Sequence, residues 1–263
     1  MALSGYSDKF IYRVLSEQDL TAYHEKGYHL FGRILTDAGL EEMLLQCMDA
    51  WTVHKQSFDP SKTWLENALL VNIHHFAPIV RDFYFEGPLV DVAEQIIGPN
   101  VKAATSQLTF KMRGNDEPFA WHQDNGYGEL DPYTAISCLT ALDDTDTENG
   151  CLWLIPGSNR ESQASHEKKA GSLDPKHRAV LEARVDESKA IPFPMKAGEC
   201  LFIHCWTLHK SEGNVSGRDR RILFNRYADA DAVEVYNKRK PRLGRLLRGK
   251  TKFQEVREFE AGL

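Results

Sequence analysis

Apolar residues in the first hundred positions recur mostly at the helical period. One amphipathic helix is predicted over 37–51, with Asp37 as its N-cap. Its apolar face carries four residues: Leu40, Met43, Leu44 and Cys47. An earlier helix is predicted to begin at a capping box formed by Ser16 and Asp19 and to end at Gly27. Two further elements are predicted in this part: a short strand over 28–35 and a helix over 89–97, closed by Gly98.

From Val101 onward the apolar residues form short runs separated by turn residues. The predicted strands are 101–110, 119–124, 134–142, 151–155, 190–195, 200–206 and 220–228. Asn149-Gly150 is a strong turn signal between two of them. Regularly spaced short strands of this kind are typical of a sandwich or jelly roll. We therefore predict one domain over 1–263, in which a mostly helical part (1–100) packs on a β-core (101–228).

Two polar segments do not fit this pattern. The stretch 160–188 has mixed charge and is interpreted as an insertion, helical over 175–183. The basic C-terminal tail, 229–263, contains the segment 238–250 with seven basic and no acidic residues. Because the whole chain carries a formal charge of -6, the remainder carries -13. A solvated surface helix is the simplest interpretation of 238–250, and attraction of an anionic substrate or nucleic acid is the alternative.

Composition narrows the class of protein. A chain of 263 residues with 42% hydrophobic residues can bury a substantial core. Its net negative charge argues against nucleic acid as a partner, and no apolar run is long enough to predict a membrane span. The start of the chain lacks the pattern of a secretory signal. Five dispersed cysteines without a C-x-x-C pair predict reduced thiols in a cytoplasmic protein.

The triplet His122-Gln123-Asp124 is the first candidate for chemistry. Side chains two residues apart on a strand point to the same face, so this imidazole and this carboxylate can aim at one point. His209, on a distant predicted strand, would complete the two-histidine, one-carboxylate facial triad of non-haem Fe(II) oxygenases. His204 is the alternative third ligand, but it lies an odd number of residues from His209 and would face the other way on an unbroken strand.

The residues around the triplet carry a more specific signal. The segment 141–158 has the pattern A-L-D-D-x-x-x-E-N-G-C-L-x-x-I-P-G-S, and 209–214 has the pattern H-x-S-x-x-N. Together with His-x-Asp, this ordered set resembles the phytanoyl-CoA dioxygenase (PhyH-like) family of Fe(II)/2-oxoglutarate-dependent oxygenases, over 16–36 and 101–228. The resemblance implies a mainly β fold with α-helices: a double-stranded β-helix, or cupin-like jelly roll, with N-terminal helices packed against it.

The resemblance also implies roles for individual residues. His122, Asp124 and His209 match the iron ligands. Arg220 matches an arginine that pairs with the distal carboxylate of 2-oxoglutarate, and a guanidinium fork suits a carboxylate. Ser211 and Gln107 match residues that contact the same cosubstrate. Arg221 competes with Arg220, but only one of two adjacent strand residues can face inward.

Other residues near the predicted pocket have weaker signals. Four could touch substrate, with packing roles as the alternative: Lys111, Asn125, Tyr127 and Trp206. Leu139 and Lys210 depart from residues common in relatives, without removing a ligand. Asp124 favours oxygenation, because related halogenases lack this carboxylate. His74 and His75 are adjacent, so on a strand they would point apart, which argues against a shared metal.

We therefore predict an Fe(II)- and 2-oxoglutarate-dependent dioxygenase that uses O2 to oxidise a C–H bond of a small-molecule metabolite, with succinate and CO2 as coproducts. A small polar metabolite or a natural-product intermediate is favoured, in a monomer or homodimer that binds neither nucleic acid nor membrane. The alternatives are an acyl-CoA hydroxylase of the same family, a zinc hydrolase on the same fold, and a non-catalytic ligand-binding member. The sequence does not choose the substrate or the type of oxidation.

Overall fold

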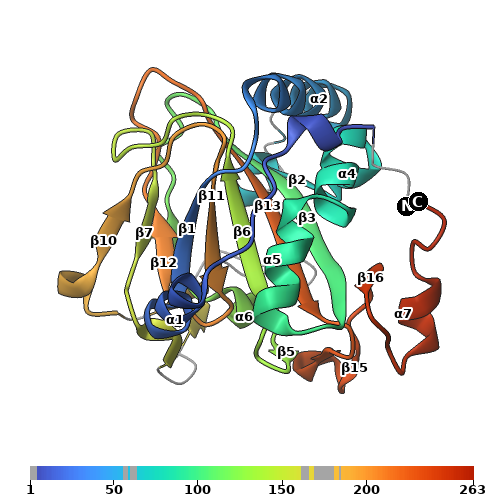
Figure 1. The fold of residues 1–263 in the computed structure, drawn as a ribbon. Coiled ribbons are helices and arrows are strands. Elements are labelled where there is room, and N and C mark those ends of the chain that lie inside the picture. The colour runs from blue at the N-terminus through green and yellow to red at the C-terminus, as the bar shows by residue number, and fades with distance from the viewer. Residues whose placement is uncertain (1–4, 56–58, 60–63, 161–165, 169–180, 184) are drawn as a thin grey trace.

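Two antiparallel sheets packed face to face, with helices over the outer side of the larger one, make up the core of the computed structural model (Figure 1). The structure describes residues 5–55, 59, 64–160, 166–168, 181–183 and 185–263. This is the jelly-roll architecture expected from the sequence, with helices braced against a β-core.

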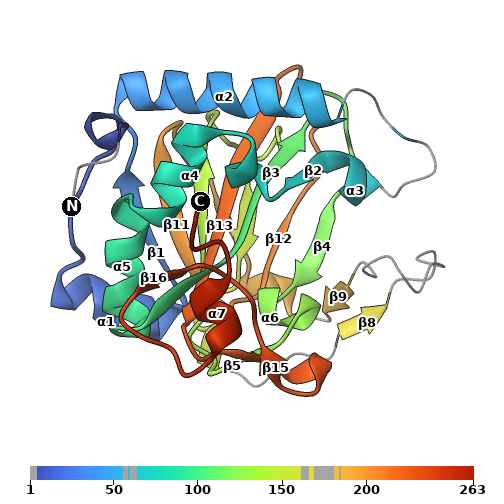
Figure 2. The same ribbon diagram turned by 90° about the vertical axis from the view of Figure 1, so that its right-hand side faces the viewer.

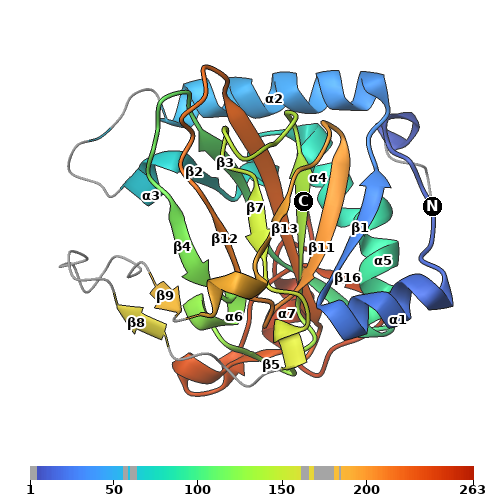
Figure 3. The ribbon, with the colours of Figure 1, turned by 90° about the vertical axis from the view of Figure 1, so that its left-hand side faces the viewer.

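The larger sheet has the strand order β1-β11-β6-β13-β3-β16, with β2 also paired to β3. Its strands are β1 (Tyr28–Arg33), β2 (Leu69–Val71), β3 (Val101–Lys111), β6 (Ile136–Ala141), β11 (Glu199–His204), β13 (Arg220–Asp229) and β16 (Leu246–Arg248). The smaller sheet has the order β10-β7-β12-β4 and lies nearest the viewer in Figure 3. Its strands are β4 (Phe119–His122), β7 (Leu152–Leu154), β10 (Ile191–Phe193) and β12 (His209–Ser211).

Alternation along β13 separates the functional side of the larger sheet from its structural side. Arg220, Ile222, Phe224 and Arg226 line a cavity between the sheets. Leu223, between two of them, and Tyr227, which follows Arg226, belong to the core beneath the helices. Successive side chains on a strand point to opposite faces, so one strand supplies both the cavity wall and the helix-packing surface.

Helices cover the structural side. They are α1 (Glu17–Lys26), α2 (Asp37–Lys55), α3 (Trp64–Ala68), α4 (Pro78–Phe85) and α5 (Pro88–Ile97). Helices α4 and α5 pack on the larger sheet, and α2 crosses one end of the sandwich (Figures 2 and 3). Proline at the first position of α4 and of α5 suits a helix start, where no intrahelical N–H bond is lost. The Tyr84 hydroxyl donates to Arg226 O (3.1 Å) and the Tyr227 hydroxyl donates to Tyr84 O (2.9 Å), which fixes α4 against β13.

The predicted helix boundaries are confirmed in part. The capping box at Ser16 and Asp19 is present, and Gly27 ends α1 in the left-handed conformation. The expectation that Asp37 caps α2 is wrong, because the Thr36 hydroxyl accepts the Gly39 N–H (3.0 Å) and Asp37 lies in the first turn. Helix α2 also runs on to Lys55. Helix α4 was not predicted.

Two other segments differ from the sequence-based expectation. Residues 175–180 of the predicted insertion helix lie outside the described residues, and Leu181–Ala183 forms strand β9, paired with β8 (His166–Lys168). The segment 238–250 is not a surface helix. It contributes β15 (Lys240–Pro241), which pairs with β14 (Val233–Glu234), and β16, which joins the larger sheet. Besides short 3₁₀ turns, the described fold also contains α6 (Asp124–Tyr127), β5 (Leu130–Asp131) and α7 (Gln254–Glu258).

The cysteines and the helices bear on the expected reduced thiols and the expected lack of a membrane span. All five cysteines are buried and free. Among the described residues, no helix combines the length and apolar character needed to cross a membrane.

Candidate active site

Two histidines face each other across the smaller sheet. His209 on β12 is the direct cross-strand partner of His122 on β4, and their ring centroids are 4.1 Å apart. Both side chains are buried. Cross-strand pairing thus brings together two residues that are 87 positions apart in the chain.

Backbone carbonyls fix the orientation of both rings. His122 Nδ1 lies 2.7 Å from Ala120 O, and His209 Nδ1 lies 2.9 Å from Thr207 O. Because a carbonyl only accepts, each Nδ1 carries a proton, and when the imidazole is neutral its Nε2 can bind a metal. A hydrogen bond of this kind at the far ring nitrogen is typical of metal-binding histidines.

Asp124 supplies the third donor. Its Oδ1 lies 3.8 Å from His122 Nε2 and 3.6 Å from His209 Nε2, so these atoms surround a common point at separations too long for hydrogen bonds. The three donor atoms lie within 4.8 Å of one another, which fits a single metal ion. The expectation that His122 and Asp124 share a strand is wrong, because β4 ends at His122 and Asp124 is the first residue of α6. The turn between them still brings the carboxylate to the histidines.

Ser137 and nearby charges keep this carboxylate ionised and oriented. The Ser137 hydroxyl donates a hydrogen bond to Asp124 Oδ2, which leaves Oδ1 facing the histidines. Burial alone would raise the pKa of Asp124, but the neighbouring His209 and Arg226 lower it overall. The donor set is therefore two imidazoles and one carboxylate oxygen. No feature of the sequence pointed to Ser137.

A buried cation lies elsewhere in the same cavity. Arg220 is 2% exposed, and its Nε and Nη2 both donate to Gly150 O, at 3.1 and 2.6 Å. Among the described residues, no carboxylate lies within salt-bridge distance of this guanidinium. Burial lowers the pKa of Arg220 to about 10, so the side chain remains charged at neutral pH. A buried charge without a counter-ion is costly, which indicates a site for an anion.

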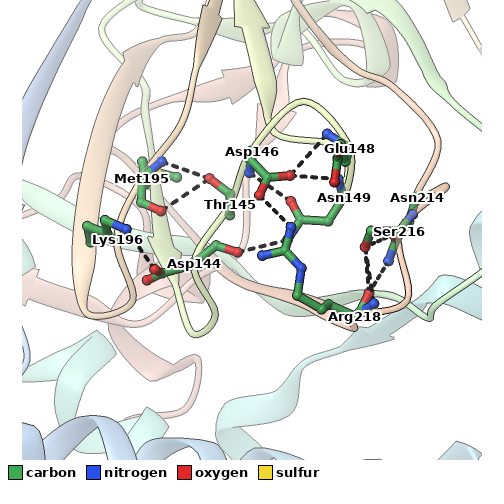
Figure 4. Close-up of polar contacts among 10 residues, drawn as sticks. All are labelled: Asp144, Thr145, Asp146, Glu148, Asn149, Met195, Lys196, Asn214, Ser216 and Arg218. Carbon is green, nitrogen blue, oxygen red and sulfur yellow. Dashed lines mark hydrogen bonds and ion pairs between the residues drawn. The ribbon is translucent and has the colours of Figure 1, made fainter.

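The loop that joins β6 to β7 holds the Gly150 carbonyl in place (Figure 4). Asp146 Oδ1 accepts the N–H groups of Glu148 and Asn149, both at 3.0 Å, and the Asn149 side chain bonds back to Asp146 N and Asp144 O, both at 2.8 Å. Arg218 Nη2 donates to Asp146 Oδ2 at 2.5 Å, which ties this loop to the start of β13.

Gly150 itself admits no other residue. Its φ is +81°, and a Cβ there would lie 2.4 Å from Glu212 O. The Asn-Gly turn predicted from the sequence therefore also forms the backbone acceptor for Arg220, a role that no sequence signal indicated.

Arg221 faces the opposite side of the sheet, as alternation predicted. Its Nε and Nη2 donate to the two carboxylate oxygens of Asp143, at 2.8 and 2.6 Å. The guanidinium also lies 5.6 Å from the Phe110 ring on the helix side. The two adjacent arginines therefore differ in their partners: Arg221 pairs with a carboxylate, whereas among the described residues Arg220 donates to a carbonyl and to no carboxylate.

A cavity of about 160 Å³ connects the triad and Arg220. Among its lining residues are the predicted Gln107, Ser211 and Tyr127, and the Tyr127 ring packs edge-on against His122 at 5.2 Å. Arg226 also lines it and was missed. It lies six residues after Arg220 on the same predicted strand, so the alternation applied to Arg221 could have placed it on the cavity side.

Three predicted substrate residues lie behind the cavity wall. Lys111 Nζ donates to Ser211 O at 3.2 Å, and burial together with Arg220 lowers its pKa to about 6. The Asn125 amide donates to Leu130 O (3.3 Å) and accepts from Arg226. Trp206 packs in a small apolar cluster with Leu130 and Cys205. None of the three is among the residues lining the cavity in the described part of the chain.

His204 is not part of the triad. Its Nδ1 accepts the Trp206 N–H at 3.1 Å, and its ring packs near Tyr23. Burial lowers the pKa of His204 to about 4 from the 6.5 of an exposed histidine. The alternative of His204 as third ligand is therefore not supported by the geometry.

This pKa predicts an acid-sensitive contribution to stability. Between pH 6.5 and 4 the unfolded chain binds a proton at His204 that the folded chain excludes, so stability falls as pH falls through this window. The effect is about 2–3 kcal/mol in the free energy of unfolding. We expect His204→Asn, whose amide oxygen can still accept from Trp206, to reduce this pH dependence in urea unfolding series. His54→Asn, at an exposed histidine, is the control; an unchanged pH dependence in His204→Asn would contradict the assignment.

A jelly roll that carries two histidines and one carboxylate on one face is typical of non-haem Fe(II) oxygenases. The family model described as phytanoyl-CoA dioxygenase (PhyH) matches residues 11–222, so the chain belongs to the phytanoyl-CoA dioxygenase family. The chain is 25% identical over 240 residues to an ectoine dioxygenase of Bordetella parapertussis, covering 81% of this chain and 75% of that protein. It is 25% identical over 231 residues to a methylphosphonate hydroxylase of Gimesia maris, covering 84% and 85%.

A solved structure supports the fold independently. The epimerase SnoN, in complex with Fe3+, alpha-ketoglutarate and nogalamycin RO, superposes with a TM-score of 0.67 at 18% identity, covering 90% of this chain and 96% of that one. At this identity the likeness concerns the fold alone. The predicted family and the predicted oxidoreductase class are confirmed by the family match and the named relatives.

Proposed function

We propose that this chain is an Fe(II)- and 2-oxoglutarate-dependent dioxygenase that oxidises a C–H bond of a small polar metabolite. The observation that carries the proposal is the presence, around one cavity, of the His-Asp-His triad and a buried arginine without a carboxylate partner among the described residues. A metal site alone fits many reactions, and an anion site alone fits many ligands. The two together fit a cosubstrate that has an oxo-acid end and a second carboxylate.

His122 Nε2, Asp124 Oδ1 and His209 Nε2 would hold the iron. Neutral imidazoles and one carboxylate suit Fe(II), and three protein ligands leave positions for a bidentate oxo acid and O2. Bound there, Fe(II) couples decarboxylation of 2-oxoglutarate to succinate and CO2 with the transfer of one oxygen atom of O2 to the substrate. The hydrogen bond from Ser137 keeps Asp124 turned toward the two histidines.

Arg220 and Ser211 would hold the distal carboxylate of the cosubstrate. The Gly150 carbonyl fixes the guanidinium, and a pair of charge-assisted hydrogen bonds to a carboxylate would neutralise its buried charge. Leu139, Ile222 and Phe224 provide apolar walls that exclude water from the same cavity. These residues position and shield the cosubstrate.

A small substrate is supported by the size of the cavity. About 160 Å³ is well below the volume typical of pockets for drug-sized ligands, which disfavours a long acyl chain. Tyr127 and Arg226, close to the triad, add polar groups that suit a small polar molecule. The named relatives act on compounds of that kind, ectoine and methylphosphonate. Asp124 occupies the position that a halide would need, which favours oxygenation.

The alternatives have less support. A zinc hydrolase does not bind 2-oxoglutarate, so it would lack the carboxylate that neutralises the buried charge of Arg220. A non-catalytic member would not need three donors around one point. An acyl-CoA hydroxylase would need a larger cavity beside the triad than the one of about 160 Å³ that the described residues form there.

We also infer that 1–263 acts as one oxygenase domain. The larger sheet includes β1 from the N-terminal part and β16 from the C-terminal part, which supports this inference. The five free cysteines support a reducing, cytoplasmic location. The net charge of -6 supports a small molecule rather than nucleic acid as partner. We further propose that the protein is a monomer or a homodimer.

The test is succinate formation. Protein loaded with Fe(II) in the absence of O2 is mixed with 2-oxoglutarate and a metabolite extract, and O2 is then admitted. We expect succinate in amounts that depend on Fe(II) and O2, and mass spectrometry should show a metabolite that gains one oxygen or loses two hydrogens. Tight binding of 2-oxoglutarate without any succinate would support the non-catalytic alternative, and absence of both would contradict the proposal.

A further inference from the structure

A second cluster of metal-ligating side chains lies outside the active-site cavity. It consists of His74, His75 and Glu260, whose donor atoms lie within 4.8 Å of one another. The two histidines belong to η2 (Ile73–His75), which follows β2, and Glu260 follows α7 near the C-terminus. In Figure 2, α7 lies in the foreground on the side of the larger sheet that also carries α4 and α5.

The local backbone makes this convergence possible. The expectation that His74 and His75 point apart assumed a strand, but they lie in a 3₁₀ turn entered through Asn72 at a φ of 54°. Adjacent residues on a 3₁₀ helix are separated by about 120° rather than 180°, so their rings can lie on overlapping sides. The two ring centroids are 4.2 Å apart.

Each donor atom is already directed at the others. His75 Nε2 lies 2.7 Å from Glu260 Oε1, and His74 Nε2 lies 3.4 Å from Glu260 Oε2. Ligand atoms around a tetrahedral zinc ion, with bonds of about 2.0–2.1 Å, are about 3.3 Å apart. A small outward shift of the Glu260 carboxylate would therefore admit an ion.

The opposite ring nitrogen of His74 is held in the manner of a metal ligand. Its Nδ1 lies 2.9 Å from Ser106 Oγ, and Ser106 is fully buried on the structural side of β3. With Nδ1 engaged, Nε2 is the atom that faces Glu260. A fixed outer hydrogen bond of this kind orients a ligating histidine.

Space for a further ligand is present. The cluster lines a cavity of about 670 Å³, together with Tyr84, Arg242 and other residues. The side chain of His74 is 5% exposed and that of Glu260 is 16% exposed, whereas that of His75 is 37% exposed. A bound ion would thus have three protein ligands and one position open to the cavity.

We propose that His74, His75 and Glu260 form a second metal site, which takes Zn²⁺ or a similar late first-row divalent ion and fastens the C-terminal segment to the turn after β2. Two imidazoles and one carboxylate are a ligand set that zinc accepts, with water as a fourth ligand. The alternative is that Glu260 only accepts hydrogen bonds from the two rings, without a metal. The proposal is independent of the oxygenase function.

The test is zinc binding by the full chain, free of any polyhistidine tag, in a background in which the triad cannot bind. We expect His122→Ala/Asp124→Ala protein to bind about one Zn²⁺ per chain in calorimetric titration. Adding His75→Ala or Glu260→Gln should weaken that binding by more than about 100-fold. Loss of a residue that only hydrogen-bonds to a metal ligand typically lowers metal affinity by about 10- to 100-fold, and loss of the ligand itself should lower it further. Adding His24→Ala, at an exposed histidine of α1, should leave it unchanged.

Thermal unfolding gives a second readout. At a zinc concentration about 100 times the Kd, the melting temperature of the triad-disabled background should rise by about 5–10 °C, and it should not rise in the Glu260→Gln version. Because neither His75 nor Glu260 is fully buried, both variants should fold, which far-UV circular dichroism would verify. Absence of zinc binding in the background, or equal binding after His75→Ala and Glu260→Gln, would overturn the proposal.

Discussion

Substitution of His209 by alanine is expected to reduce succinate formation by at least about 10³-fold, equivalent to about 4 kcal/mol in activation free energy. His209 Nε2 lies 3.6 Å from Asp124 Oδ1 and is one of three donor atoms around a single point. Its removal leaves two donors, too few to hold iron firmly. Fe(II) binding, measured by competition with a chromogenic chelator, should weaken in parallel.

His204→Asn provides the matched control, because His204 is the other histidine of the segment 200–209 but lies outside the triad. It should bind Fe(II) and turn over as the wild type does at neutral pH. If His209→Ala retained normal iron affinity and turnover, or if His204→Asn lost them, the ligand assignment would be wrong.

Substitution of Arg220 by methionine is expected to raise the KM for 2-oxoglutarate by roughly 30- to 1000-fold. Loss of a desolvated charge partner costs about 2–4 kcal/mol of binding free energy. The effect should fall mainly on KM, because the distal carboxylate does not react. Iron binding should be unchanged, since the Arg220 side chain is not one of the three donors.

In the absence of cosubstrate, Arg220→Met should not lower the stability of the protein. Arg220 is buried, and in the described part of the chain it donates to the Gly150 carbonyl and to no carboxylate, so its charge is not compensated until an anion binds. We expect Arg220→Met to be at least as stable as the wild type without cosubstrate, and to lose the stabilisation that 2-oxoglutarate confers on the wild type. Arg221→Met is the control. It loses its ion pair with Asp143 and some stability, but its KM for 2-oxoglutarate should not change.

Sequence periodicity was sufficient for three of the strands that line the cavity. The predicted runs 101–110, 134–142 and 220–228 correspond closely to β3, β6 and β13, because turn residues flank each of them, whereas β2 and β12 were not predicted. Alternation along the last of these correctly separated Arg220 from Arg221, which lie on opposite faces. The same argument would have found Arg226.

The remaining features depend on contacts between distant segments. Pairing of His122 with His209 depends on the register of β4 against β12, which no local pattern encodes. The hydrogen bond from Ser137 to Asp124 depends on where β6 passes Asp124. Gly150 binds Arg220 through its backbone carbonyl, which every residue type has, so the residue type does not reveal this role. Convergence of His74 and His75 follows from a 3₁₀ turn in a place where a strand was assumed. In each case tertiary structure, and not local propensity, decides the outcome.

Calorimetric titration of 2-oxoglutarate into Fe(II)-loaded protein without O2 would show whether the triad and Arg220 form one site for Fe(II) and 2-oxoglutarate. We predict one binding event per chain in the wild type and in Arg221→Met, and a Kd weakened roughly 30- to 1000-fold in Arg220→Met. Equal affinity in Arg220→Met and the wild type, or no binding in the wild type, would contradict the account.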